Sequence, residues 1–272
     1  MSVINTNVKS IVAQNALAVN NRNLGKAMEQ LSTGKRINTA SDDAAGLAIA
    51  DRMTGQIRAL NQSVRNANDA VSMMQTAEGA TNEISNMLER MRELAIQSAN
   101  DSYGDADREA LQTEYDQLSD EITRIAQNTQ WNGMSILKDD KEMTYQVGTQ
   151  GNADSSIKVK FQQMDAGKLG VADLSLADNG SSQTAIGNLD DAIQAVDTYR
   201  ATLGAKINRM TSAADNLSNV SMNTSASRSR ILDTDYAQAT TELARAQIIQ
   251  QAATAMLAQA NQQPQAVLSL LK

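Results

Sequence analysis

The sequence contains no cysteine, no histidine and a single proline, Pro264, among its 272 residues. Without cysteine the chain cannot form disulfides or thiolate metal sites, and without histidine it lacks the commonest metal ligand and general base. The shortage of helix breakers permits long helices. Aromatic residues make up only 3% of the chain, so aliphatic residues and methionine must fill its core, as they do in helix seams. We therefore expect no catalytic residues, no cofactor and no metal ligands.

Charge is also missing from both ends of the chain, over residues 10–21 and 246–271. Charge keeps an exposed helix solvated, so these ends are expected to be covered. Glutamines interrupt the C-terminal run, whereas a membrane span needs about 20 mostly apolar residues. We therefore predict no membrane partner and expect protein as the cover, each end against the other and both against further copies. The formal net charge of −7 argues against nucleic acid as a partner.

Apolar residues at alternating spacings of three and four predict three long helices. One runs from about Ala44 to Ser98, where the spacing continues from Ala50 to Met74 and resumes from Ile84 to Ala95. Ser41, Asp42 and Asp43 supply a capping residue and acids at its start. The second helix follows the break at 100–104 and ends near Asn128, before the tight-turn pair Asn132-Gly133. The third begins at about Thr184 and keeps one heptad phase to Leu217, interrupted only by Arg200.

Between the second and third helices, residues 143–147 and 157–161 alternate apolar and polar side chains around a glycine-containing segment, which predicts a β-hairpin. The rest, to Ser182, is expected to be loop. Two polar segments, 32–39 and 223–230, are predicted to be linkers. The fold is therefore expected to be mainly α, an elongated antiparallel helical bundle with terminal coiled-coil arms and a small β-hairpin. The predicted domains are paired arms at 1–43 and 231–272, and a bundle at 44–230 with its hairpin near 140–165.

The two arms carry the residues that we expect to pack between helices and between copies. In the C-terminal arm, small residues repeat every seven positions and larger ones lie on an offset seam. In the N-terminal arm, apolar residues occupy two nearly opposite faces, which a single partner helix cannot cover. The residues of the first pattern are Ala239, Ala246, Ala253, Ala260 and Val267, with Ile249, Met256 and Leu270 offset; those of the second are Ile4, Val8, Ile11 and Val19, opposed by Leu17, Leu24, Met28 and Leu31.

Two motifs at the ends of the chain resemble those of a known family. The N-terminal motif comprises Leu31–Asn38 followed by Ser41–Leu47. The C-terminal motif comprises Ser229–Ile231, Asp233, Asp235-Tyr236, Ala246–Ile248, Leu257–Gln262, Pro264-Gln265 and Val267–Leu271. Both are similar to the terminal signatures of bacterial flagellins, and the resemblance covers about residues 1–137 and 183–272. The middle of the chain departs from larger flagellins, because it has room for the hairpin but not for their outer variable domains.

The resemblance implies a structural protein that polymerises with itself into the extracellular flagellar filament, the propeller of swimming motility. The arms would form the inner coiled-coil layer and the bundle the surrounding tube. Export would occur unfolded through the flagellar type III channel, which accounts for an N-terminus without the basic and apolar regions of a cleavable signal. The implied partners are an export chaperone on the C-terminal arm, a filament cap protein and hook-associated junction proteins.

The resemblance also implies recognition of the bundle by the vertebrate toll-like flagellin receptor. The matching segment is Arg90–Ser98, and by resemblance Arg90, Leu94, Gln97 and Glu114 would be contacts. From the sequence alone, a charged pair such as Arg90 and Glu114 is better interpreted as solvated helix surface, and the receptor contact rests on the resemblance.

Three alternatives remain beside the filament subunit. A hook–filament junction protein shares a related N-terminal motif and a similar helical ending. An enzyme of the metalloprotease-bearing flagellin type would need a His-Glu-x-x-His motif, which a chain without histidine cannot contain. A generic helical rod explains the periodicity but not the two terminal motifs.

Overall fold

The structure is a computed structural model that describes the backbone of residues 6–269 and the side chains of residues 6–152 and 154–262. The predicted packing residues Ile4 and Leu270 lie outside the described residues, as does the side chain of Val267. The chain divides into two compact units: a terminal unit of residues 1–57 and 222–272, and a central unit of residues 58–221. These boundaries differ from the predicted ones because the first residues of one long helix and the last of another belong to the terminal unit.

Five α-helices contain most of the described residues. They are α1 (Val8–Thr33), α2 (Ala44–Ser98), α3 (Asp105–Asn128), α4 (Asn179–Leu232) and α5 (Tyr236–Ser269). The predicted bounds of α2 and the predicted end of α3 are confirmed. Asp43 caps α2, since its Oδ1 accepts a hydrogen bond from the Gly46 N–H at 2.8 Å. None of the described helices is long and apolar enough to cross a membrane.

Two of the sequence predictions about α4 are wrong. The helix begins at Asn179 rather than near Thr184, because Asp178 Oδ1 accepts a hydrogen bond from the Ser181 N–H at 2.8 Å and caps it. The predicted linker at 223–230 is helical throughout. No glycine or proline interrupts that stretch, and its Arg228 Nη1 donates to Thr54 Oγ1 of α2 at 3.2 Å. A polar composition by itself therefore did not break this helix.

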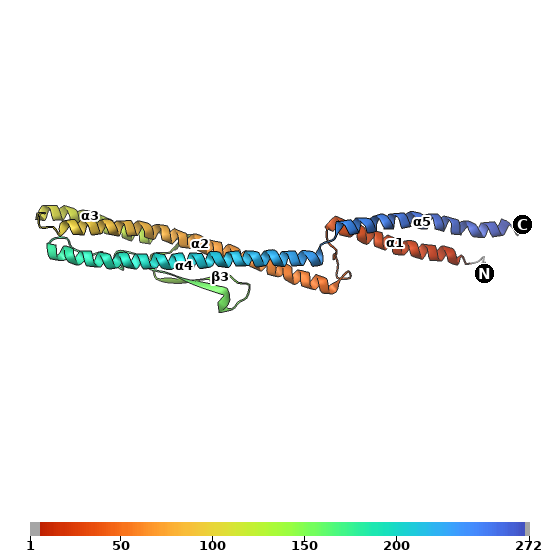
Figure 1. The fold of residues 1–272 in the computed structure, drawn as a ribbon, viewed down its shortest axis with the longest axis horizontal. Helices are drawn as coiled ribbons and strands as arrows, with labels where there is room; N and C mark the ends of the chain where they lie inside the picture. Colours follow the sequence, from red (N-terminus) through yellow and green to blue (C-terminus); the bar gives the residue numbers. More distant parts are fainter. Residues whose placement is uncertain (1–5, 270–272) are drawn as a thin grey trace. The chain divides into compact units, whose positions relative to one another are not determined.

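In the central unit, α2, α3 and α4 lie alongside one another (Figure 1). Side-chain contacts join Asn61 to Ser221, Asn82 to Arg200 and Arg92 to Asp190. Residue numbers fall along α4 as they rise along α2, so these helices are antiparallel. The contact of Arg200 with Asn82, at 3.0 Å, explains how a cation fits into the heptad phase of α4: its head group reaches across to an amide oxygen of the facing helix.

Short strands cover part of this bundle. β1 (Gln130–Trp131) and β2 (Met134–Ser135) pair across Asn132 and Gly133, whose φ angles of 49° and 75° are those of a left-handed two-residue turn. β3 (Lys141–Gln146) pairs antiparallel with β4 (Ser156–Phe161), with the 3₁₀ turn η1 (Ala153–Ser155) before β4. This is the hairpin that the alternating pattern predicted. Ile157, Val159 and Phe161 of β4 are buried, while Lys158 and Lys160 between them are exposed.

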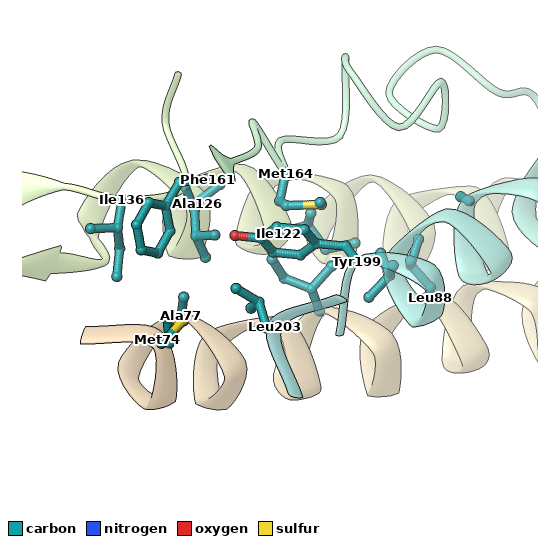
Figure 2. Packing of buried hydrophobic residues seen from close by; sticks show 14 of the residues in the cluster. Met74, Ala77, Leu88, Ile122, Ala126, Ile136, Phe161, Met164, Tyr199 and Leu203 are labelled. Atoms are coloured by element: carbon teal, nitrogen blue, oxygen red, sulfur yellow. The ribbon is translucent and has the colours of Figure 1, made fainter. Parts of the chain in front are cut away.

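The core of the central unit is aliphatic and methionine-rich, as the composition predicted. Figure 2 shows Met74 and Ala77 of α2 facing Leu203 and Tyr199 of α4, with Ile122 of α3 beside them. The four predicted seam residues Ile84, Leu88, Met91 and Ala95 are all fully buried. Sequence neighbours Met73 and Met74 are both buried, and so are Leu94 and Ala95. Adjacent residues lie about 100° apart on a helix, so α2 buries a stripe wider than a two-helix seam.

Candidate assembly surface and candidate receptor surface

In the terminal unit, α1 and α5 pack against each other as an antiparallel pair (Figure 1). Their least exposed residues follow alternating spacings of three and four on both helices, as in a coiled coil. On α1 these are Ser10, Ala13, Leu17, Asn20, Leu24, Ala27 and Leu31, and on α5 Ala239, Leu243, Ala246, Gln250, Ala253, Leu257 and Ala260. The predicted packing residues Leu17, Leu24, Leu31, Ala246, Ala253 and Ala260 thus lie on this seam, which joins the arms of one chain.

Polar side chains fix the register of the pair. Asn20 is buried, and its Nδ2 donates to the Ala246 carbonyl oxygen at 2.8 Å. At the N-terminal end of α1, Asn7 Nδ2 donates to the Ala260 carbonyl oxygen at 2.8 Å, and the Ser10 hydroxyl donates to Asn261 Oδ1 at 3.0 Å. A slip of α5 along α1 would leave the buried Asn20 amide without its partner, which is costly.

The segment after α1 is tied to the segment before α5. Gly34 ends α1 with a φ of 70°, and its carbonyl oxygen accepts from the Thr234 N–H at 3.0 Å. The Arg36 N–H donates to the Leu232 carbonyl oxygen at 2.7 Å. Gly34 is required twice here, because φ is positive and a Cβ would lie 3.1 Å from the Tyr236 hydroxyl. The glycine of the N-terminal motif therefore holds the start of α5 beside the end of α1.

Asp42 orders the rest of this segment. It accepts hydrogen bonds from the Thr39 and Asn38 N–H groups at 3.0 and 3.2 Å, and pairs with Lys26 Nζ at 2.9 Å. Lys26, followed by these two backbone donors, holds the pKa of Asp42 well below its usual range. The carboxylate therefore links the loop before α2 to α1.

Outside the seam, both arms present apolar side chains to solvent. On α1, Val8, Ile11, Val12, Val19 and Met28 are about half exposed or more; on α5, Ile248 is 66%, Ile249 41% and Met256 65% exposed. Val8, Val12 and Met256 line one groove of about 340 Å³ with Ala13 and Ala260. We call these side chains the outward apolar faces. Large apolar side chains exposed in such a continuous set mark an interaction surface.

The sequence predicted most of this arrangement and missed some of it. Two opposed apolar faces on α1 were predicted, and the structure places one on the seam and the other outward. Met28 was assigned to the seam side but is 55% exposed, because the seam follows Leu24, Ala27 and Leu31 instead. Val12 and Ile248 were not singled out, although their apolar character next to seam positions was a usable signal.

The candidate receptor surface lies on α2 and α3 of the central unit. Arg90 pairs with Glu114 on α3 and with Glu93 one turn away, both at 2.9 Å. Glu93 first, and then Glu114, raise the pKa of Arg90. All three side chains are about half exposed or more, so solvent screens the pairs and they contribute little to stability. Gln97 is exposed and donates to the Tyr103 hydroxyl at 3.1 Å.

Leu94 does not belong to this surface, which corrects the prediction. Its side chain has no exposed area and lies in the central core. The resemblance placed it with its charged neighbours, but the wide buried stripe of α2 includes it. Arg90, Gln97 and Glu114 remain together as an exposed polar group between α2 and α3.

Within the described residues, no three acidic side chains come close enough together to hold a metal ion. The acidic residues just before α2 and just before β3 have structural partners. Asp43 caps α2, and Asp140 Oδ1 accepts from the Gln163 N–H at 3.0 Å.

Comparison with known proteins identifies the chain's relatives. Residues 4–142 match the model of the bacterial flagellin N-terminal helical region, and residues 186–271 match that of the bacterial flagellin C-terminal helical region. A flagellin of Halalkalibacterium halodurans is 44% identical over 272 residues, which cover 99% of this chain and 100% of the relative. The flagellar filament 30.7 kDa core protein of Treponema maltophilum is 41% identical over 285 residues, 99% of each chain.

A solved structure assigned to a flagellar hook-associated protein of Vibrio parahaemolyticus has a TM-score of 0.59 over 71% of this chain and 100% of that one. At 14% identity this likeness concerns the fold alone. The two family matches and the full-length identity decide between the alternatives. The chain belongs to the bacterial flagellin family.

Proposed function

We propose that the outward apolar faces of α1 and α5 are the surfaces through which copies of this chain assemble into a filament. Membership of the flagellin family makes the chain a structural protein of the extracellular flagellar filament and not an enzyme. The observation that carries the proposal is that each arm uses one face for the seam and keeps a second apolar face uncovered. Burying such area is favourable by roughly 25 cal/mol per Å², and identical copies offer identical faces.

The experiment places a charge on an outward face and measures assembly. Val12→Asp should raise the critical concentration for polymerisation more than about 100-fold, because an unpaired carboxylate would be buried in every subunit contact. Val12 is 61% exposed in the single chain, so the charge is tolerated there. Circular dichroism of the free subunit should therefore be unchanged, and sedimentation measures the polymer.

Two controls separate burial from charge. Val12→Ile keeps an apolar, β-branched side chain and should assemble normally. Asn152→Asp adds the same charge to the exposed loop between β3 and β4 and should also assemble. Normal assembly of Val12→Asp would remove the outward face of α1 from the filament contacts.

The same outward apolar faces also bear on the export of the subunit and its binding to a chaperone before assembly. We propose export in an unfolded form through the flagellar type III channel, with a cytoplasmic chaperone on the C-terminal arm and later contacts with the cap and junction proteins. The support is that α5 carries Ile248, Ile249 and Met256 on its surface in a segment without charge. Ile248→Asp should weaken co-purification of the chaperone with this chain, while Thr241→Asp, on a more polar part of α5, should not.

Recognition by the toll-like receptor is proposed for Arg90, Gln97 and Glu114. Two observations support this proposal. The three side chains are exposed together on α2 and α3, and the Arg90–Glu114 ion pair faces solvent, so a receptor could replace either partner. Replacing Arg90 and Glu114 together by alanine should lower receptor activation by the free subunit. The matched control is Arg124→Ala, because Arg124 forms a similarly exposed ion pair with Glu121 on α3. If the double variant activates the receptor as strongly as the unaltered subunit, these residues are not receptor contacts.

A further inference from the structure

Among the described methionines, a buried group and an exposed group differ greatly in accessibility, with Met53, Met87 and Met143 between them. Met73, Met74, Met91, Met164 and Met210 are buried in the central core. Met28, Met134, Met222 and Met256 are exposed, and Met256 is the most exposed of them at 65%. Oxidation of a thioether requires access of the oxidant to sulfur, so the folded chain should discriminate strongly between the two groups.

Met256 is also placed where a change of polarity matters. It lies on the outward face of α5 and lines the groove formed with Val8, Val12 and Ala13 of α1. Val8, Val12, Ala13 and Ala260 of this groove are aliphatic, and methionine adds a flexible, polarisable side chain, while Lys9 and Gln259 are its polar lining residues. Met222, of similar exposure at 63%, lies on α4 and outside this groove.

We infer that Met256 is an oxidation site at which a peroxide converts the free subunit to a form that cannot assemble. The inference rests on the proposed role of the outward faces. In the reaction, the sulfur lone pair attacks one peroxide oxygen, the O–O bond breaks and an S–O bond forms. Sulfur loses two electrons, the peroxide is reduced to water, and methionine becomes its sulfoxide.

The sulfoxide would weaken assembly because a second copy of the chain would bury its oxygen. Its oxygen is a strong hydrogen-bond acceptor that water satisfies in the free subunit. Covered by a second copy against Val8 and Val12, it would lose that water and place a polar group where the thioether made apolar contact, which lowers the free energy gained by burial. Fold and arm pairing should be unaffected, because Met256 is 65% exposed in the free subunit and is not one of the seam residues. Oxidation therefore separates folding from assembly, and reduction by methionine sulfoxide reductase restores assembly.

The test uses the full chain, with Met28→Leu in every variant so that the other outward-face methionine does not contribute. The free subunit is treated with hydrogen peroxide, sulfoxides are mapped by mass spectrometry, and the critical concentration is measured by sedimentation. Oxidation should reach Met256 at least about tenfold faster than Met91. The critical concentration should rise about tenfold, equivalent to about 1.4 kcal/mol per subunit.

Two further variants assign the effect to one residue. Met256→Leu keeps volume and apolarity, so it should assemble normally and lose its sensitivity to peroxide. Met222→Leu removes an equally accessible sulfur elsewhere and should remain sensitive. Unchanged assembly of protein oxidised at Met256 would overturn the inference, as would full peroxide sensitivity of Met256→Leu. Neither result would contradict the proposed assembly surface, which is contradicted only if Val12→Asp assembles normally.

Discussion

Tyr115 offers the sharpest test of how the central unit is held together. Its ring is fully buried on α3, and its hydroxyl donates to the Val171 carbonyl oxygen at 2.9 Å. Val171 belongs to the irregular segment between β4 and α4 and is itself fully buried. Tyr115→Phe removes one oxygen atom and leaves the packing of the ring in place.

The expected cost follows from that geometry. Removing the donor leaves a buried carbonyl group unsatisfied, which costs about 1–3 kcal/mol. For a unit of residues 58–221, about 2 kcal/mol corresponds to a fall in Tm of about 4–8 °C. Tyr199→Phe is the matched control, because its ring is 2% exposed and its hydroxyl has no partner of good hydrogen-bond geometry among the described residues. Burial raises the pKa of Tyr199, and the nearby backbone of Gln162 slightly opposes that rise.

The assay is thermal unfolding of the free subunit by calorimetry and circular dichroism. Tyr115→Phe should melt lower than the unaltered chain, whereas Tyr199→Phe should melt at the same temperature or higher, because it removes a buried hydroxyl that is poorly satisfied. If the two variants lose the same stability, the hydrogen bond to Val171 is not the cause, and the reasoning from buried polar partners fails for this unit.

Four further results are expected. Burial raises the pKa of Tyr199 to about 12, so its proton stays bound in the folded chain while the unfolded chain releases it. Stability should be full below pH 10 and fall by about 1.4 kcal/mol per pH unit for this group up to about pH 12, measured by urea unfolding. Because Lys26 lowers the pKa of Asp42, the stabilisation from this carboxylate is present above about pH 4 and lost as pH falls below it. Protease cleavage of the chain at residues 34–43 should therefore increase in acid. The Asp42→Asn variant should be cleaved there readily at neutral pH. Ala253→Asp, on the seam facing α1, should separate the arms and abolish sedimentable polymer while the melting of the central unit stays unchanged; normal polymer would refute the seam. EDTA should leave assembly unaltered, and a loss of polymer in chelator would reveal a metal requirement.

Much of this fold followed from the sequence because its helices are long and regularly spaced. The heptad spacing from Ala50 to Ala95 predicted α2, and the Asn132-Gly133 pair predicted the left-handed turn that the structure contains. The alternation in 143–147 and 157–161 predicted the hairpin. These features depend on neighbouring residues only: caps, turn conformations and the period of a helix or strand are local properties of the chain.

Apart from the start of α4, which the local cap at Asp178 sets, the errors concern which neighbour covers a helix. Polar residues 223–230 remain helical because Arg228 and its neighbours pack beside α2, whereas composition alone predicted a linker. Leu94 is buried because α2 contacts more than one helix, and Met28 is exposed because the α1–α5 seam passes on its other side.

The sequence by itself determined the periods, the ends of most elements and the need of the arms for a cover, because these follow from local spacing and from missing charge. Only the tertiary structure decided which apolar face of α1 is used within the chain and which is left outward for other copies. The spacing on the two faces is equally regular, so choosing between them depends on the position of α5. That position is set by distant contacts, such as Asn20 to the Ala246 carbonyl and Gly34 to Thr234.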